Sequence, residues 1–177
     1  MNLIILHIKK TLGFIIVVII FHSCNVANSK KEYGDYFYKT VNSETWKLRG
    51  IEIGDYIDSV KTKETSALIK QTNELLYYET KLNDSDYFNT SYYFDKSLLY
   101  EIRLDINITN KEKAEELNQN LKAFLSKQLG EISLIEHYTI WKTKNNFSQK
   151  IEIALSKDTT EANHTQLFLS VADYDYK

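Results

Sequence analysis

The sequence predicts an α+β fold, in which one antiparallel sheet, or two of them, carries its helices on one face. Residues 98–108 alternate between apolar and polar side chains, which is typical of a half-buried strand. Residues 110–129 instead repeat apolar side chains at helical spacing. A helix followed by three strands occurs twice along the chain, so the order of elements favours two αβββ halves.

The first half is predicted to begin with a helix over residues 56–71. Asp55 can cap this helix, and Glu64 interrupts its apolar stripe. In the strand 98–108, Leu98, Tyr100 and Ile102 begin the set of side chains expected in the core, and Leu99 begins the set expected in water. Turns rich in Asn, Asp and Ser separate the three predicted strands, at 74–82, 87–94 and 98–108.

The second half is predicted to begin with a helix whose capping box is formed by Thr109 and Glu112. Gly130 follows the last helical residue, where glycine is favoured. One apolar face is formed by Ala114, Leu117, Leu121, Phe124, Leu125 and Leu129. Three more strands are predicted, at 132–142, 147–156 and 166–174.

Composition narrows the class of protein. The 177 residues suggest one domain, the absence of proline permits long strands and helices, and thirteen tyrosines and eight phenylalanines favour strands. The formal net charge is −2, and no cluster of basic residues appears. A nucleic-acid partner is therefore not expected.

A short apolar run lies near the start of the chain. Residues 12–21 are apolar apart from Gly13, and Lys9 and Lys10 precede them. About ten residues are too few for a membrane-spanning helix, which needs about 20. A basic flank, a short apolar run and a small residue after it predict a secretory signal peptide over residues 1–23.

The only cysteine of the chain is Cys24, in the stretch Phe21-His22-Ser23-Cys24. This stretch resembles the lipobox of bacterial lipoproteins. The resemblance implies cleavage after Ser23, acyl chains such as palmitate attached through the Cys24 sulfur, and a place in the bacterial cell envelope, at the inner or the outer membrane. An ordinary signal peptide cleaved elsewhere and an uncleaved anchor are the alternatives.

The exported part is predicted to be a tether followed by one folded domain. Residues 24–43 are mostly polar and are expected to form a flexible tether. Residues 44–177 form the predicted domain, with halves at 44–108 and 109–177. The element order and the stretch "IEIGDYIDSV" resemble small envelope lipoproteins of the BamE/SmpA type and the β-lactamase-inhibitor-protein fold, with Gly54 and Val60 at the matching positions.

No motif for catalysis, nucleotide binding or metal binding is present, so no catalytic residue, nucleotide, metal or other cofactor is expected. After cleavage only His137 and His164 remain as histidines, and they are too far apart in sequence for a recognisable metal motif. Metal binding by these two with carboxylates is the less favoured alternative.

Aromatic residues are the candidates for contact with a partner, because tyrosine and tryptophan are enriched at interfaces. Consecutive tyrosines, as in Tyr77-Tyr78, are expected to divide between the two faces of the sheet. His137, Thr139 and Trp141 share one strand face, opposite Tyr138 and Ile140, and are the predicted contact residues.

These observations predict a non-enzymatic lipoprotein of the envelope, whose domain binds or scaffolds another envelope protein. The acylated Cys24 would provide its attachment to the membrane. A lipid-anchored periplasmic inhibitor or immunity protein and a glycan-binding module are the alternatives.

Overall fold

The computed structural model describes residues 25–161 and 164–176. The predicted signal peptide over residues 1–23, its cleavage at Ser23 and the lipidated Cys24 lie outside the described residues. The helices are α2 (Asn25–Val41), η1 (Leu48–Gly50), α3 (Ile57–Lys63) and α4 (Lys111–Leu129). The strands are β1 (Ala67–Gln71), β2 (Leu75–Lys81), β3 (Tyr87–Asp95), β4 (Leu98–Ile108), β5 (Ser133–Ile135), β6 (Tyr138–Lys144), β7 (Lys150–Glu161) and β8 (His164–Asp173).

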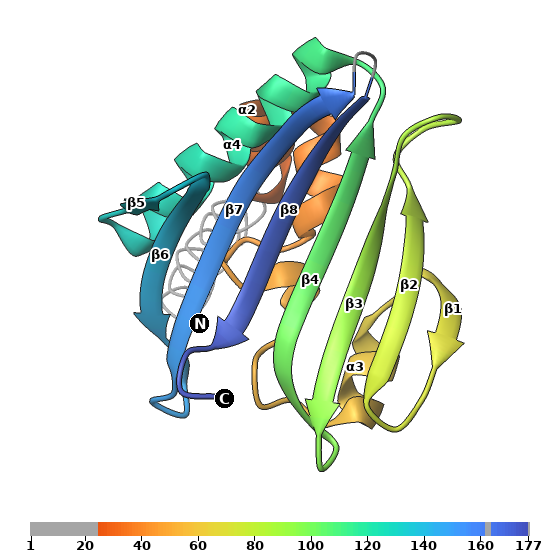
Figure 1. Cartoon of the computed structure of the whole chain (residues 1–177), viewed down its shortest axis with the longest axis vertical. Coiled ribbons are helices and arrows are strands. Elements are labelled where there is room, and N and C mark those ends of the chain that lie inside the picture. The colour runs from red at the N-terminus through yellow and green to blue at the C-terminus, as the bar shows by residue number, and fades with distance from the viewer. Residues whose placement is uncertain (1–24, 162–163, 177) are drawn as a thin grey trace, which may run out of the picture.

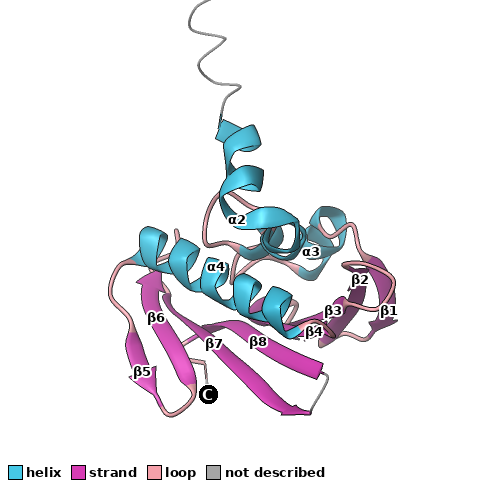
Figure 2. Cartoon of the chain, turned by 90° about the horizontal axis from the view of Figure 1, so that it is seen from above, coloured by secondary structure: helices cyan, strands magenta, loops and turns pink. Residues whose placement is uncertain are grey.

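The strands form one antiparallel sheet in the order β1-β2-β3-β4-β8-β7-β6-β5 (Figure 1). Figure 2 shows α2, α3 and α4 on the same side of this sheet, which confirms the predicted α+β fold. Each half of the chain contributes a helix and four neighbouring strands, and the halves meet where β4 pairs with β8. The sequence predicted either one sheet or two. Because strand pairing continues from β4 to β8 between the halves, the strands form a single sheet.

Each half contains one strand more than expected. The predicted helix over 56–71 ends at Lys63, because the Glu64 side chain accepts hydrogen bonds from the backbone N–H groups of Thr65 and Ser66. The residues beyond it form the edge strand β1. In the second half, a turn that contains Glu136 with φ 53° divides the predicted strand 132–142 into β5 and β6.

Helix α4 covers the second half of the sheet and matches its prediction except at its first turn. The predicted apolar face is buried at Ala114, Leu117, Leu121, Phe124 and Leu125. Asn110, not Thr109, is the N-cap, and its side-chain oxygen accepts a hydrogen bond from the Lys113 N–H at 2.9 Å. Thr109 instead donates its hydroxyl and its N–H to the Asp86 carboxylate, each at 2.8 Å.

Helix α2 contradicts the predicted flexible tether over residues 24–43, as far as those residues are described. Tyr33, Phe37 and Val41 are buried in the core. The rings of Tyr33 and Phe37 pack on Phe124 of α4, with centroid distances of 5.7 and 5.0 Å. The four-residue spacing of these three side chains is the sequence signal for an apolar helix face, which the many polar residues between them obscured.

Candidate functional site

The side of the sheet opposite the helices is its open face, since no helix covers it within the described residues (Figure 2). Its side chains are those that alternate with the buried residues of each strand. Two aromatic residues of the segment that follows β8 also lie on this side. The open face is defined here by Tyr77, Tyr87, Tyr93, Tyr100, Arg103, Asp105, Tyr138, Phe168, Tyr174 and Tyr176.

Consecutive tyrosines divide between the two faces, as predicted. Tyr78 and Tyr92 are 4% and 0% exposed, and their rings pack edge to face in the core. Tyr77 and Tyr93 therefore point to the open face, because neighbouring residues of a strand point to opposite sides. The Tyr93 ring lies 5.2 Å from the guanidinium carbon of Arg103.

A β-bulge places Tyr100 on the open face as well. Phe94 pairs with Leu99 and Tyr93 with Glu101, so Tyr100 is the extra residue in β4. Leu99 is buried, so the predicted alternation is wrong from Leu98 to Tyr100. From Ile102 on, the side chains expected in the core are buried, but Asn107, which was expected in water, is buried as well. The Tyr100 ring lies 6.3 Å from that of Tyr93, so the bulge builds an aromatic ledge from two strands.

A hollow of about 440 Å³ lies over β4, β8, β7 and β6 on the open face. Its floor crosses a row of paired residues in which Arg103 stands opposite Ser170, and Ser170 opposite Ala154. The small side chains of Ser170 and Ala154 leave space between larger neighbours. Phe168, Tyr138 and Asp105 also line the hollow.

Charges lie beside the aromatic rings of the hollow. Arg103 donates from Nε to Glu101 Oε1 at 2.7 Å and from Nη2 to Glu101 Oε2 at 3.3 Å. Partial burial raises the pKa of Asp105, and the nearby Arg103 charge offsets this only in part. No hydrogen bond from another described residue reaches the Asp105 carboxylate, so a cationic or hydrogen-bonding group of a ligand would stabilise it.

The predicted contact residues do not form a shared surface, and that prediction is wrong. Trp141 is 0% exposed on the helix side, where its Nε1 donates to Ser126 Oγ of α4 at 3.2 Å. Thr139 is buried on the same side, and His137 is exposed in the turn between β5 and β6. Alternation correctly separated Trp141 from Tyr138, but it could not tell which set α4 would cover.

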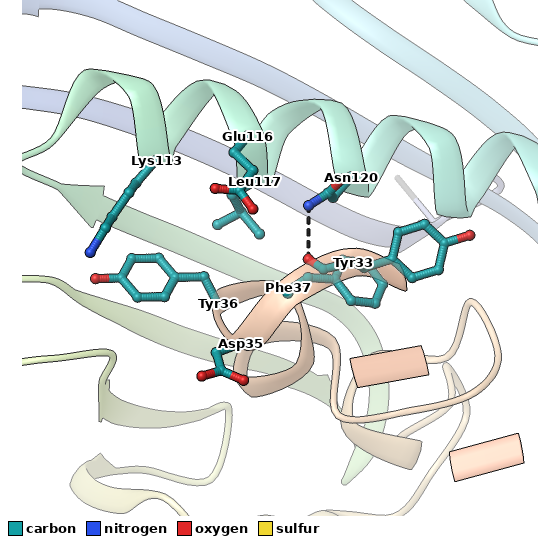
Figure 3. Close-up of a pocket in the computed structure, with 9 residues that line it drawn as sticks. Tyr33, Asp35, Tyr36, Phe37, Lys113, Glu116, Leu117 and Asn120 are labelled. Atoms are coloured by element: carbon teal, nitrogen blue, oxygen red, sulfur yellow. Dashed lines mark hydrogen bonds between the residues drawn. The ribbon is translucent and has the colours of Figure 1, made fainter. Parts of the chain in front are cut away.

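A smaller cavity of about 220 Å³ lies between α2 and α4 (Figure 3). Gly34 has φ 76° and bends α2 there, which turns the Tyr33 carbonyl toward α4. Asn120 donates to this carbonyl at 2.8 Å, and the Lys113 ammonium lies 5.2 Å from the centre of the Tyr36 ring. These two contacts join α2 to α4, so we assign this cavity to the packing of α2 and not to a ligand.

Within residues 25–161 and 164–176, no cluster of three or more His, Cys, Asp or Glu side chains is arranged to hold a metal ion. In the same part of the chain, no helix has both the length and the apolar character needed to cross a membrane. His164 Nε2 lies 3.2 Å from Asn107 Oδ1. No protein-family model, curated protein or solved structure matches this chain.

Proposed function

We propose that this chain is a lipid-anchored protein of the bacterial cell envelope, and that its open face binds another envelope protein. The observation that carries the proposal is an uncovered sheet face with a hollow of about 440 Å³, which Tyr138 and Phe168 line together with Arg103 and Asp105. Large aromatic side chains with a polar tip are enriched at protein interfaces. In this proposal the domain has a binding role and performs no catalytic step.

The position of α2 supports this proposal. The helix begins at Asn25, directly after Cys24, and rises from the helix side of the sheet (Figure 2). Its first nine residues, up to the bend at Gly34, span about 14 Å at 1.5 Å per residue. Acyl chains on Cys24 would thus hold the helix side toward the bilayer and present the open face to the periplasm.

A periplasmic inhibitor or immunity protein is the second candidate, and Asp105 is the observation that favours it. Its carboxylate lies half-buried in the hollow and lacks a hydrogen-bond donor within the described residues. A basic group on a target enzyme could provide that donor. The identity of the captured protein distinguishes an enzyme target from a structural envelope partner.

Affinity purification from native membranes tests the proposal, with Arg103→Ser/Tyr138→Ser as the open-face variant. Lys111→Ser/Ala123→Ser, which changes exposed residues of α4 and also removes one positive charge, is the matched control. We expect one protein to co-purify with the wild type and the control, and to be lost with the open-face variant. Equal recovery with both variants would contradict the proposal.

Mass spectrometry of the same material tests the anchor. An N-terminal peptide that begins at an acylated Cys24 is expected, and Cys24→Ser should release the protein from the membrane fraction. A peptide that begins elsewhere and carries no lipid would refute the anchor, and it would leave the result for the open face standing.

A further inference from the structure

The segment Tyr174–Tyr176 follows β8 and lies on the open face. Each of the three side chains of this segment contacts a residue of the sheet. The Tyr174 ring centre is 4.6 Å from Lys142 Nζ. The Asp175 carboxylate is 3.2 Å from Lys150 Nζ. The Tyr176 ring stacks on Tyr100, with a centroid distance of 3.9 Å and an interplanar angle of 13°.

The lysines under this segment are arranged unfavourably for the fold alone. Lys144 stands directly opposite Lys150 in the pairing of β6 with β7, and like charges in that position destabilise a sheet. Lys142 lies on the same face of β6, two residues before Lys144. Its Nζ is 3.7 Å from Glu152 Oε2. Among the described residues, no acidic group forms an ion pair with Lys144. An anionic group bound here would relieve the repulsion.

Space for a larger occupant exists at the same place. A cavity of about 400 Å³ is lined by Lys142, Lys144, Lys150 and Tyr174. The ledge of Tyr93 and Tyr100 lies on the other side of the segment and already holds one stacked ring. The surface therefore combines an aromatic ledge with a group of ammonium ions.

Within this segment, Asp175 and Tyr176 are held weakly enough to leave. Lys150 and Asp175 are 59% and 60% exposed, and ion pairs at such exposure contribute little to stability. Tyr176 is 43% exposed, and its N–H reaches the Asp173 carbonyl only at 3.3 Å. Neither Asp175 nor Tyr176 belongs to the core, so their displacement would not unfold the sheet.

We infer that this part of the open face is a subsite for an extended segment of a partner protein in which an aromatic residue follows an acidic residue. The chain's own Asp175 and Tyr176 occupy the subsite and must be displaced before the partner binds, while Tyr174 stays in place beside it. This inference rests on the proposed function, since it specifies the chemistry of the partner. It adds a regulatory step, because internal occupancy weakens the apparent affinity for the partner.

The test uses the full exported chain and, as the probe, the peptide Asp-Tyr-amide with a fluorescent label on its N-terminus. Asp175→Ser/Tyr176→Ser vacates the subsite and keeps Tyr174, whose N–H bonds the Lys150 carbonyl at 2.8 Å. Binding is measured by fluorescence anisotropy. Tyr87→Ser, an open-face change away from the subsite, is the control.

We expect the vacated variant to bind the peptide saturably and at least about ten-fold more tightly than the wild type or the control. Adding Lys150→Gln to the vacated variant should weaken binding again, as should replacing Asp by Asn in the peptide. The single variant Tyr176→Ser provides the same comparison if the double variant is poorly folded.

Equal peptide affinity of the vacated variant and the wild type, or no saturable binding by either, would overturn the inference. These failures differ from failure of the proposed function, which would appear as partner capture that is insensitive to Arg103 and Tyr138. A peptide that binds the vacated variant without dependence on Lys150 would also contradict the assigned subsite.

Discussion

Arg49 and Glu64 form a two-bond ion pair inside the protein. The Arg49 Nε lies 2.7 Å from Glu64 Oε2 and Nη2 lies 2.8 Å from Oε1, with the side chains 6% and 0% exposed. The Tyr92 hydroxyl donates a further hydrogen bond to Glu64 at 2.6 Å. This network joins η1, the end of α3 and the centre of β3, so it fixes the first half of the domain.

Removing one member of this pair should destabilise the domain strongly. Glu64→Ala leaves the buried guanidinium without its counter-charge, and we expect a loss of about 3–5 kcal/mol in the free energy of unfolding. Urea denaturation measures it. Glu32→Ala, which breaks the exposed pair with Lys127, is the control and should leave the free energy of unfolding nearly unchanged. A similar loss in both variants would contradict the structural role of the buried pair.

The same pair predicts a dependence of stability on acid. Burial alone would raise the pKa of Glu64, but hydrogen bonds from Arg49 and Tyr92 and the Arg49 charge outweigh it and lower the pKa from 4.5 to about 2. The resulting stabilisation, on the order of 3 kcal/mol, is complete above pH 4.5 and is lost as the pH falls toward 2. The stability difference between wild type and Glu64→Gln should therefore narrow over this interval. If the stability difference between wild type and Glu64→Gln stays the same over this pH interval, the lowered pKa of Glu64 is refuted.

Gly34 is predicted to be necessary for the packing of α2. Its φ of 76° is unfavourable for other residues, and a Cβ there would lie 3.3 Å from Glu116 Oε1. Gly34→Ala should cost about 1–2 kcal/mol and accelerate amide hydrogen exchange around Phe37. Gly50→Ala has a similar φ, of 70°, but no atom within 4 Å of the added Cβ, so it should leave exchange in α2 unchanged. Equal exchange in the two variants would contradict this account.

Asp86 is predicted to hold three elements together. Its carboxylate accepts hydrogen bonds from the Tyr36 hydroxyl of α2 at 2.6 Å and from the Thr109 N–H at the start of α4 at 2.8 Å. Asp86→Ala should therefore lower the free energy of unfolding by about 2–3 kcal/mol, whereas the neighbouring exposed Asp84→Ala should change it by less than about 0.5 kcal/mol. Thermal unfolding of the two variants checks this prediction, and indistinguishable transitions would contradict it.

Trp141 is predicted to be a core residue with no contact to a partner. In Trp46→Phe it is the only tryptophan left, and its fluorescence should be blue-shifted and insensitive to iodide, because the side chain is 0% exposed. Trp141→Phe should lose the hydrogen bond to Ser126 and some core volume without changing partner capture. Strong iodide quenching, or loss of the partner, would restore Trp141 as a surface residue.

Local sequence patterns predicted where helices and strands occur better than they predicted which side of each strand is buried. The spacing of Leu117, Leu121 and Phe124 identified α4 correctly, because helical period and burial agree there. The boundary of α3 depended on the Glu64 side chain, which accepts hydrogen bonds from the Thr65 and Ser66 N–H groups, and the spacing of apolar residues does not reveal such bonds.

The candidate site could be predicted only in part, for the same reason. Alternation predicted that consecutive tyrosines divide between the two faces of the sheet, but it did not say which member of each pair lies on the open face. It could not place Tyr100, since a bulge between β3 and β4 reverses the pattern before Ile102. Which strand face α4 covers is a property of the whole chain, and this choice buried Trp141 and left Tyr138 on the open face.

Site-specific photo-crosslinking in native membranes tests the central claim most directly. A photoreactive phenylalanine derivative replaces Phe168, in the hollow of the open face, and in a second strain it replaces the exposed Ala123 of α4. The account predicts one reproducible crosslinked envelope protein from position 168 and none of that species from position 123. The same crosslinked protein at equal yield from both positions, or crosslinks from position 123 alone, would contradict it.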